Sequence, residues 1–477
     1  MKFTLSPFEL FVLPTRTRFP FRYGIASMTH VPQLFVRTRV HVGADARHGL
    51  AAEGLPPKWF TKDPPTTFEQ DLPQMLAVVQ HAAARAGEIA RAPLTFFEMW
   101  RELDRQQTEW ASAGAIAPLL AHVGVSLVER AVLDGICRLA GEPLHQVIRR
   151  NRLELRLAEI YGDLAGLTPG DVLPSAPLST CAVRHTVGLG DPITAADIPP
   201  EDRADDGLPQ DLESCIRAYG LHYFKVKLTG KVETDVPRLE LLVSLFEREA
   251  PGGWHVTLDG NENFHDFEAF RGFWENARSR PGLEPLWSRV LVVEQPVHRN
   301  HALSPGASAA LRQWRDRPPL IVDESDGAVG DVPLALQSGY AGASHKNCKG
   351  IVKGLANAAV LHRIRSAGGA AVLTGEDLAN LGPVALLQDL AMMAALGITH
   401  VERNGHHYYR GLSMFPERWQ DATLAAHGDL YQRHPGGFPT LRIERGRLEL
   451  GSVNEAPFGV GPAFDPSAFD RLEQGVV

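Results

Sequence analysis

The sequence predicts an α/β fold: a parallel (β/α) barrel of the TIM type with an N-terminal α+β capping domain and a C-terminal closing segment. After about residue 150, short apolar runs alternate with helical stretches, which is the pattern of βαβ units in a parallel sheet. About eight such units occupy roughly 250 residues, the size of a TIM barrel. An open doubly wound sheet is the alternative, but no GxGxxG turn or P-loop accompanies the predicted strands.

The capping domain is expected over residues 1–150. Its first part alternates apolar and polar residues, as in "LFVRTRVHVG", which is typical of a half-buried strand. From Thr67 to Arg149 apolar residues recur at i, i+3 and i+4, which predicts helices. The barrel is expected over 151–414, with the acid-rich stretch from Gly188 to Gly220 as an insertion after its first strand. Residues 415–477 are expected to form a closing tail of strands and turns.

Composition excludes several classes of protein. The 477 residues are 44% hydrophobic and 22% charged, which favours large buried cores over disorder. With 48 basic and 56 acidic residues the formal net charge is −8, so no nucleic-acid or membrane partner is expected. Four scattered cysteines without CxxC spacing fit a reducing cytoplasm. The start of the chain lacks the pattern of a signal peptide, so we expect a cytoplasmic protein.

Charged residues mark the ends of seven consecutive predicted strands. From Lys227 onward the successive charges are 23 to 35 residues apart, about one βα unit each. They are Lys225 and Lys227, then Asp259 with Asn261 close behind, Glu294, Asp323, Lys346, Glu376 and Glu402. A single acid at such a place is usually a helix cap or a solvated loop charge. A whole series at the carboxyl ends of barrel strands predicts an active site.

Three of these acids predict a metal site. Asp259, Glu294 and Asp323 each follow an apolar run, so each emerges where a buried strand ends. Carboxylates that converge there would raise each other's pKa, and a divalent cation removes that repulsion. Ligation by oxygen alone favours Mg²⁺, with Mn²⁺ as a possible substitute, over zinc. Glu324 adjoins Asp323, and strand alternation allows only one of the two to face inward.

The stretch "YFKVKLTG" places Lys225 and Lys227 on one face of a strand, pointing into the barrel, while Phe224 and Val226 point outward. A neighbouring cation and a desolvated site both lower a lysine pKa, so one of the two is expected to act as a general base. Lys346 comes from the sixth strand, across the ring from the second. Lys227 and Lys346 would then flank a substrate carbon from opposite faces, with the metal between them.

These residues suit one chemistry: a metal holds a carboxylate, a lysine removes the α-proton, and the metal stabilises the ene-diolate. Two alternatives come from other classes of protein. One is a barrel hydrolase, for example a glycosidase that uses Glu294 and another acid. The other is a metal-binding barrel without catalysis.

Nearly the whole chain resembles the enolase superfamily, because it contains "KVK", "LDGNEN", "VEQP", "VDES" and "SHKNCKG" in this order. Within the superfamily it resembles the mandelate racemase and muconate lactonizing enzyme group, and in particular the branch of that group that uses two lysines. The resemblance implies a modified barrel, a small carboxylate substrate and a homo-oligomer. It implies Asp259, Glu294 and Asp323, rather than Glu324, as Mg²⁺ ligands. Lys227 and Lys346 would be the acid/base pair, and Lys225 would tune Lys227. Racemisation or epimerisation is the preferred reaction; acid-sugar dehydration and cycloisomerisation share the same enolate.

Asn261, Glu376, Glu402 and Asn404 are expected to contact the substrate. Glu376 either contacts the substrate or caps the following helix. Strand eight ends in Glu402–Arg403–Asn404, which departs from the DxD of the dipeptide epimerases and argues against a dipeptide.

Three further segments complete the expectations for the site. "GHHYYRG", Gly405 to Gly411, either reads the substrate or is a plain loop. The resemblance also implies that capping loops near "YGIASMTH" and "LPPKWFTK" close over the site. There Arg22 and Lys58 are either partners for a distal anion or solvated charges.

Overall fold

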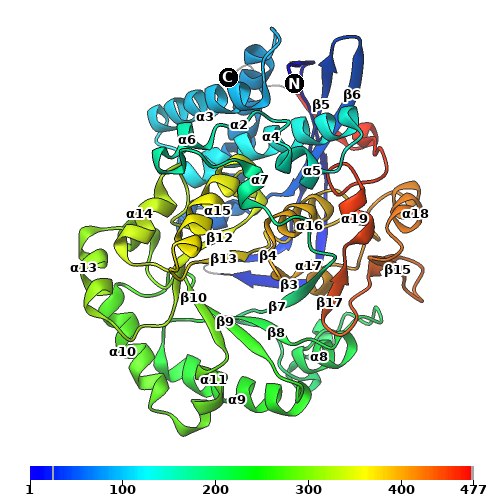
Figure 1. The fold of residues 1–477 in the computed structure, drawn as a ribbon. Coiled ribbons are helices and arrows are strands. Elements are labelled where there is room, and N and C mark those ends of the chain that lie inside the picture. The colour runs from blue at the N-terminus through cyan, green and yellow to red at the C-terminus, as the bar shows by residue number, and fades with distance from the viewer. Residues whose placement is uncertain (24–25, 474–477) are drawn as a thin grey trace.

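The computed structural model describes residues 1–23 and 26–473, and its centre is a closed barrel of eight parallel strands (Figure 1). Each strand pairs with the next, and the last pairs with the first, so the sheet has no free edge. The barrel and the N-terminal α+β part confirm the predicted fold class. The eight strands are β7 (Thr180–Val187), β8 (Tyr223–Lys227), β9 (His255–Asp259), β10 (Val290–Glu294), β11 (Leu320–Val322), β12 (Gly342–His345), β13 (Val372–Gly375) and β14 (His400–Arg403).

Helices follow the strands and cover the outside of the barrel (Figure 1). Their apolar faces pack on the outward side chains of the strands; Phe224 of β8, for example, stacks on Phe246 at a ring distance of 4.0 Å. The helices are α8 (Leu212–Tyr219), α9 (Val232–Glu249), α10 (Phe267–Arg278), α11 (Glu284–Trp287), α12 (Arg299–Ala302), α13 (Pro305–Gln313), α14 (Asp331–Ser338), α15 (Ile351–Ser366), α16 (Ala385–Leu396) and α17 (Gly405–Tyr408).

An antiparallel sheet and a layer of helices form the N-terminal part. The sheet contains β1 (Thr4–Leu5), β2 (Glu9–Leu13), β5 (Gln33–Val42) and β6 (Asp45–Gly54), and a separate hairpin pairs β3 (Arg16–Tyr23) with β4 (Ala26–His30). The helices are α1 (Pro57–Thr61), α2 (Phe68–Ile89), α3 (Phe96–Ala113), α4 (Pro118–Ala140) and α5 (Leu144–Arg149), followed by the short α6 (Leu157–Ile160) and α7 (Pro169–Val172).

Helix α4 joins the N-terminal part to the barrel. It is buried around almost its whole circumference, because β6 packs on one side and the segment after β12 on the other. The approach to β6 is close: a Cβ on Gly49 would lie within 2.0 Å of a backbone oxygen of α4. Glycine at this position is therefore required by packing.

The C-terminal segment returns to both halves of the molecule. It contains α18 (Glu417–Ala426), β15 (Tyr431–Arg433), β16 (Pro439–Leu441), β17 (Arg447–Glu449), α19 (Gly451–Glu455) and β18 (Asp470–Leu472). β17 pairs antiparallel with β7 of the barrel, and β18 pairs antiparallel with β2. The expectation of strands and turns alone is wrong here, because α18 places Trp419 in a cluster of aromatic rings.

The stretch after β7 is only in part an insertion. Residues 188–211 form loops and single helical turns, whereas Leu212–Tyr219 is α8, the first helix of the barrel. Asp211 caps α8 by accepting a hydrogen bond from the Ser214 backbone amide. Among the described residues, no helix has the length and hydrophobicity needed to cross a membrane.

Candidate active site

The two lysines of β8 reach the interior of the barrel, as strand alternation predicts. Both are buried, with Lys225 only 1% exposed. The Lys225 Nζ donates to carboxylates on three other strands, at 2.9 Å from Glu294, 2.5 Å from Glu376 and 3.0 Å from Glu402. It also lies 3.1 Å from Asp259. Lys227 donates to Asp259 at 2.7 Å.

Asp323 is the centre of a second group of charges, opposite the first. Its Oδ2 accepts a hydrogen bond from Lys346 at 2.6 Å, and its Oδ1 lies 2.7 Å from the Nζ of Lys349. Ser344 also donates to Oδ1, at 2.5 Å. The Gln295 Oε1 accepts from the Asp323 backbone amide, which fixes the turn after β11.

Lys349 is a site residue that the sequence reasoning missed. It is 1% exposed and lies one helical turn after Lys346, in the single 3-10 turn Asn347–Lys349. The signal was the spacing of the two lysines in "SHKNCKG", since residues three apart in a turn lie on the same side. Glu324 lies outside this group, and burial among other acids raises its pKa to about 7.

In this arrangement, where carboxylates surround the ammonium groups, the lysine pKa is raised, whereas the sequence predicts a lowered pKa beside a cation. Burial alone would lower the pKa of Lys225, but the surrounding carboxylates outweigh it and hold that pKa well above its usual value. The pKa of Lys227 is raised in the same way, against burial, chiefly by Asp259. The pKa of Lys346 is raised by Asp323. All three lysines are therefore ammonium groups at neutral pH in this arrangement.

The three predicted metal ligands come from neighbouring positions at one end of the barrel. Glu294 is in register with Asp259 on β9 and with Ile321 on β11, two residues before Asp323. The Glu294 Oε2 is buried and has no hydrogen-bond partner among the described residues. Burial and the neighbouring acids hold the Glu294 pKa well above its usual value. An unpartnered oxygen in an all-carboxylate set fits a hard divalent cation.

Lysine ammonium groups separate these acids. The Lys225 Nζ contacts both Asp259 and Glu294, and both oxygens of Asp323 have lysine partners. These three acids are not close enough together to form a set whose ligand atoms all lie within 4.8 Å of one another. In the described part of the chain, the one such set of His, Cys, Asp or Glu side chains lies at the outer face of β7. Asp259, Glu294 and Asp323 lie at one end of the barrel and are the residues that would hold a divalent cation there.

A cavity of about 390 Å³, open to solvent, lies over these charges. Its floor includes Lys225, Lys227, Asp323, Lys346 and Glu402, and its walls include Phe21, Pro56, Trp59, Asp377, Leu378, Ala379 and Asn404. The Lys346 Nζ lies 4.6 Å from the centre of the Trp59 ring, a cation–π contact. The barrel and the N-terminal part therefore both line this cavity.

The residues expected to contact the substrate divide into two groups. Glu402 and Asn404 line the cavity, and Glu402 accepts a hydrogen bond from Thr186 at 2.7 Å. Glu376 pairs with Arg184 and Lys225 below the cavity. The capping alternative for Glu376 is wrong, since α16 begins at Ala385 with no side-chain cap. Asn261 donates its backbone amide to Asp259, and its side-chain oxygen has no partner among the described residues.

The capping loops contribute apolar side chains to the cavity rather than charges. Lys58 turns away to an ion pair with Asp71 at 2.8 Å. Arg22 lies beside Gly190, outside the lining of the cavity. The first loop includes residues 24–25, which fall outside the described residues.

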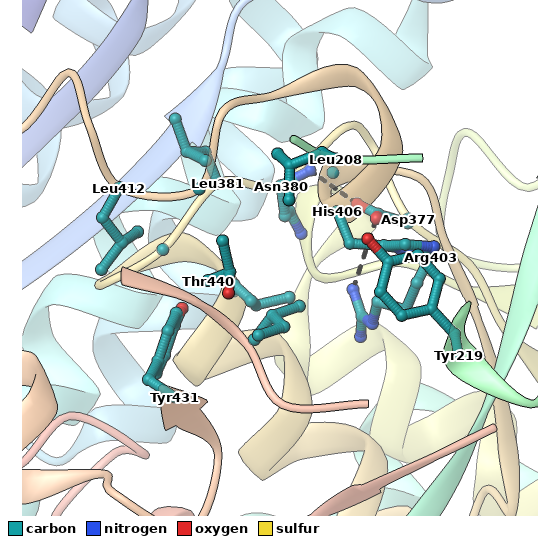
Figure 2. Close-up of a pocket in the computed structure, with 15 residues that line it drawn as sticks. Leu208, Tyr219, Asp377, Asn380, Leu381, Arg403, His406, Leu412, Tyr431 and Thr440 are labelled. Atoms are coloured by element: carbon teal, nitrogen blue, oxygen red, sulfur yellow. Dashed lines mark hydrogen bonds and ion pairs between the residues drawn. The ribbon is translucent and has the colours of Figure 1, made fainter. Parts of the chain in front are cut away.

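Gly405–Gly411 borders a different cavity, of about 480 Å³ (Figure 2). Figure 2 shows Asp377 between Asn380 and Arg403; the Asp377 carboxylate accepts from the Asn380 amide and lies 3.6 Å from the Arg403 guanidinium. Arg403 also pairs with Asp389 of α16. The middle residue of Glu402–Arg403–Asn404 therefore points away from the lysines, as alternation along β14 requires.

Comparisons with known proteins identify the fold. Neither the protein-family models nor the curated proteins gave a match. Among solved structures, an enolase from Bradyrhizobium complexed with magnesium and mandelic acid aligns with a TM-score of 0.58 and 13% identity over 98% of each chain. A muconate lactonizing enzyme from Pseudomonas fluorescens, complexed with muconolactone, aligns with a TM-score of 0.59 and 16% identity over 98% of this chain and 99% of that chain.

An N-succinyl Arg/Lys racemase from Bacillus cereus aligns with a TM-score of 0.57 and 15% identity, over 95% of this chain and 98% of that chain. The chain therefore has the enolase-like fold, which the sequence resemblance predicted. Its structural neighbours over nearly the full length are members of the mandelate racemase and muconate lactonizing enzyme group. At these identities the likeness establishes the fold, and function has to be argued from the site.

Proposed function

We propose that the protein is a Mg²⁺-dependent enzyme that removes the proton α to a substrate carboxylate through an enolate, with racemisation or epimerisation as the net reaction. One observation carries the proposal: Lys227 and Lys346 face the same cavity from strands four steps apart in the barrel. In an eight-stranded ring these strands lie on opposite sides. The two ammonium groups are held by Asp259 and Asp323, two of the three proposed ligands.

Asp259, Glu294 and Asp323 would hold the cation. When bound, Mg²⁺, or Mn²⁺ in its place, supplies positive charge that stabilises the developing enolate and lowers the pKa of nearby ammonium groups. Lys227 Nζ then accepts the α-proton on one face of the substrate, and Lys346 Nζ returns a proton on the other. In the reverse direction the two lysines exchange roles.

The remaining residues of the cavity position these groups. Lys225 balances the charge of Glu376 and Glu402, and Lys349 holds the second oxygen of Asp323. Trp59 and Phe21 give the cavity an apolar wall that limits access of water. A small carboxylate suits this cavity, since the lining combines a few charges with apolar and aromatic side chains.

The test is exchange of the α-proton in D₂O with Mg²⁺, across acid sugars, N-acyl amino acids, dipeptides and hydroxy acids. Lys227→Ala and Lys346→Ala are each expected to lower exchange by roughly 10²–10⁴-fold, the usual contribution of a general base. If both lysines act as bases, each variant loses exchange from one enantiomer and keeps exchange from the other. Lys231→Ala, an exposed lysine at the start of α9, is the matched control.

The product distinguishes the related reactions. Loss of water indicates dehydration, formation of a lactone or other ring indicates cycloisomerisation, and an inverted centre indicates racemisation or epimerisation. Exchange that continues unchanged in both lysine variants, or without a divalent cation, would contradict the mechanism. Glycoside hydrolysis without metal would favour the hydrolase alternative.

A further inference from the structure

A cluster of buried histidine and cysteine side chains lies outside the barrel, apart from the cavity. His185 of β7, Cys215 of α8 and His407 of α17 each offer a ligand atom, and these atoms all lie within 4.8 Å of one another. All three residues are at most 2% exposed. His185 lies between Arg184 and Thr186, which face inward to Glu376 and Glu402, so alternation turns His185 outward.

We propose that His185, Cys215 and His407 form a structural site for a borderline divalent metal, with Zn²⁺ as the occupant. Sulfur and imidazole nitrogen are the ligands that Zn²⁺ prefers, whereas Mg²⁺ prefers oxygen. The site is therefore chemically distinct from the carboxylates in the barrel.

The distances in the cluster fit tetrahedral zinc. With Zn–S of about 2.3 Å and Zn–N of about 2.0–2.1 Å, a sulfur and a nitrogen bound to one zinc ion lie about 3.5 Å apart. The Cys215 Sγ and the His407 Nδ1 are 3.5 Å apart. That separation suits two ligands on one ion.

His406 supplies the second layer around the proposed site. Its Nε2 lies 3.0 Å from the Nδ1 of His185, so it orients that ring, as the outer partner of a metal-bound histidine commonly does. Its own Nδ1 is buried without a hydrogen-bond partner among the described residues. A buried cluster with an unpartnered nitrogen is incomplete as a hydrogen-bonded core.

Burial keeps the three histidines in the form that binds metal. It lowers the pKa of His185 to about 3, and it holds the pKa of His406 and His407 well below the usual value. Burial raises the pKa of the Cys215 thiol, so metal binding must release one proton from Sγ to solvent as the metal–sulfur bond forms.

The charged residues around the cluster do not prevent metal binding. Arg18 approaches it and donates to the His407 backbone oxygen, but it is neutralised by Asp206, with contacts of 2.6 and 2.8 Å. Burial, Asp211 and Asp191 raise the Cys215 pKa. One thiolate leaves a bound Zn²⁺ with a single net positive charge.

A metal here would connect three elements, because its ligands come from β7, α8 and α17. β7 begins the barrel, α8 follows it, and α17 comes directly after Asn404 at the edge of the cavity. The proposed role is therefore to fix the end of β14, which carries Glu402 and Asn404.

The test uses the full chain, freed of metal with a chelator and then titrated with Co²⁺ in excess Mg²⁺, which occupies the oxygen site. One equivalent of Co²⁺ is expected to give a near-ultraviolet cobalt–thiolate absorption band, which Zn²⁺ then removes. Cys215→Ser is expected to abolish the band. Cys181→Ser is the matched control, because Cys181 is equally buried and lies on β7 with its thiol away from the cluster.

A wild-type protein without the band overturns the proposal, and so does a band that persists in Cys215→Ser. If Cys215→Ser does not fold, His407→Gln takes its place and is expected to weaken Co²⁺ binding at least 10-fold, the usual loss for a metal ligand or its partner. Binding is also expected to weaken about tenfold per unit fall in pH, because one proton is released. None of these measurements depends on catalysis, so the proposed function can fail without affecting this result.

Discussion

In two places in this molecule a buried basic side chain is paired with carboxylate groups, and the two places have different surroundings. In the barrel, Lys225 is surrounded by four carboxylates beneath an open cavity. Between the N-terminal part and the barrel, Arg130 of α4 pairs with Glu53, and both side chains are 0% exposed. The second cluster is absent from the lining of the described cavities.

The partners of the two clusters explain the difference. Arg130 donates to the Ala52 backbone oxygen at 3.0 Å, and the neighbouring Glu129 accepts from the backbone amides of Ile351 and Val352 at the start of α15. These hydrogen bonds connect α4 to β6 and to α15. The Lys225 ammonium contacts side chains alone, on strands that end at the cavity. The buried charge of Lys225 thus has side-chain partners beneath a cavity, whereas the buried charges of Arg130 and Glu129 also hold backbone groups.

The largest effect is expected from Lys225→Met. It leaves four buried carboxylates without their shared cation, so the free energy of unfolding should fall by about 3–5 kcal/mol in the presence of a chelator. Mg²⁺ should recover much of this loss, because the proposed ligands Asp259 and Glu294 are two of the four carboxylates. Urea unfolding with chelator and with Mg²⁺ measures both values. A loss that Mg²⁺ leaves unchanged would contradict the proposed metal site.

Arg130→Met should destabilise the protein by a similar amount, about 3–5 kcal/mol, because it leaves Glu53 buried and unpaired. Here Mg²⁺ should add only the stabilisation that it gives the wild type, since no proposed ligand is involved. The same unfolding experiment compares the two variants. Specific recovery of Arg130→Met by Mg²⁺ would show that the two clusters are not separate.

A smaller effect is expected for Glu294→Gln. Mg²⁺ at 100 times its Kd should stabilise the wild type by about 2.7 kcal/mol, through its preference for the folded state. Glu294→Gln should lose this increment, because the amide cannot supply the negative charge of the carboxylate. Differential scanning calorimetry with and without Mg²⁺ gives the comparison. The control is Glu275→Gln, because Glu275 lies on the exposed face of α10. A change at Gln295 would not serve, because its side chain accepts a hydrogen bond from the Asp323 backbone amide.

The last prediction concerns the pH dependence of stability and Glu129. Burial raises its pKa to about 8, despite the backbone amides that favour the ionised form. The folded state therefore holds the proton more tightly than the unfolded state, so this group stabilises the fold below about pH 4.5 and loses that contribution as pH rises toward 8. The decline is at most about 1.4 kcal/mol per pH unit.

Glu129→Gln should flatten this decline between pH 5 and 8. Some decline should remain, because burial also raises the pKa of Glu53, to about 7. Urea unfolding at several pH values measures the slope. A slope that is the same in the variant and the wild type would assign the effect to other groups.

Several features of the site could be predicted from short stretches of sequence. The period of two along "KVK" fixes Lys225 and Lys227 on one face, and a charge after each apolar run fixes the acids at one end of the barrel. These features depend on residues that are close in sequence and on the rule that parallel strands share a carboxyl edge. The barrel, the capping part and the positions of Asp259, Glu294, Asp323 and Lys346 follow from them.

The partners of these residues depended on contacts between distant segments, and only the tertiary structure decided them. Lys225 meets Glu402 across 177 positions, and Cys215 meets His407 across 192. Contacts of this kind raise the pKa of the β8 lysines, because that pKa depends on how many carboxylates surround each ammonium group. The pairing of β17 with β7 and of β18 with β2 is of the same kind. The local sequence pattern determines which way a side chain points, and the closure of the barrel determines which other side chains it contacts.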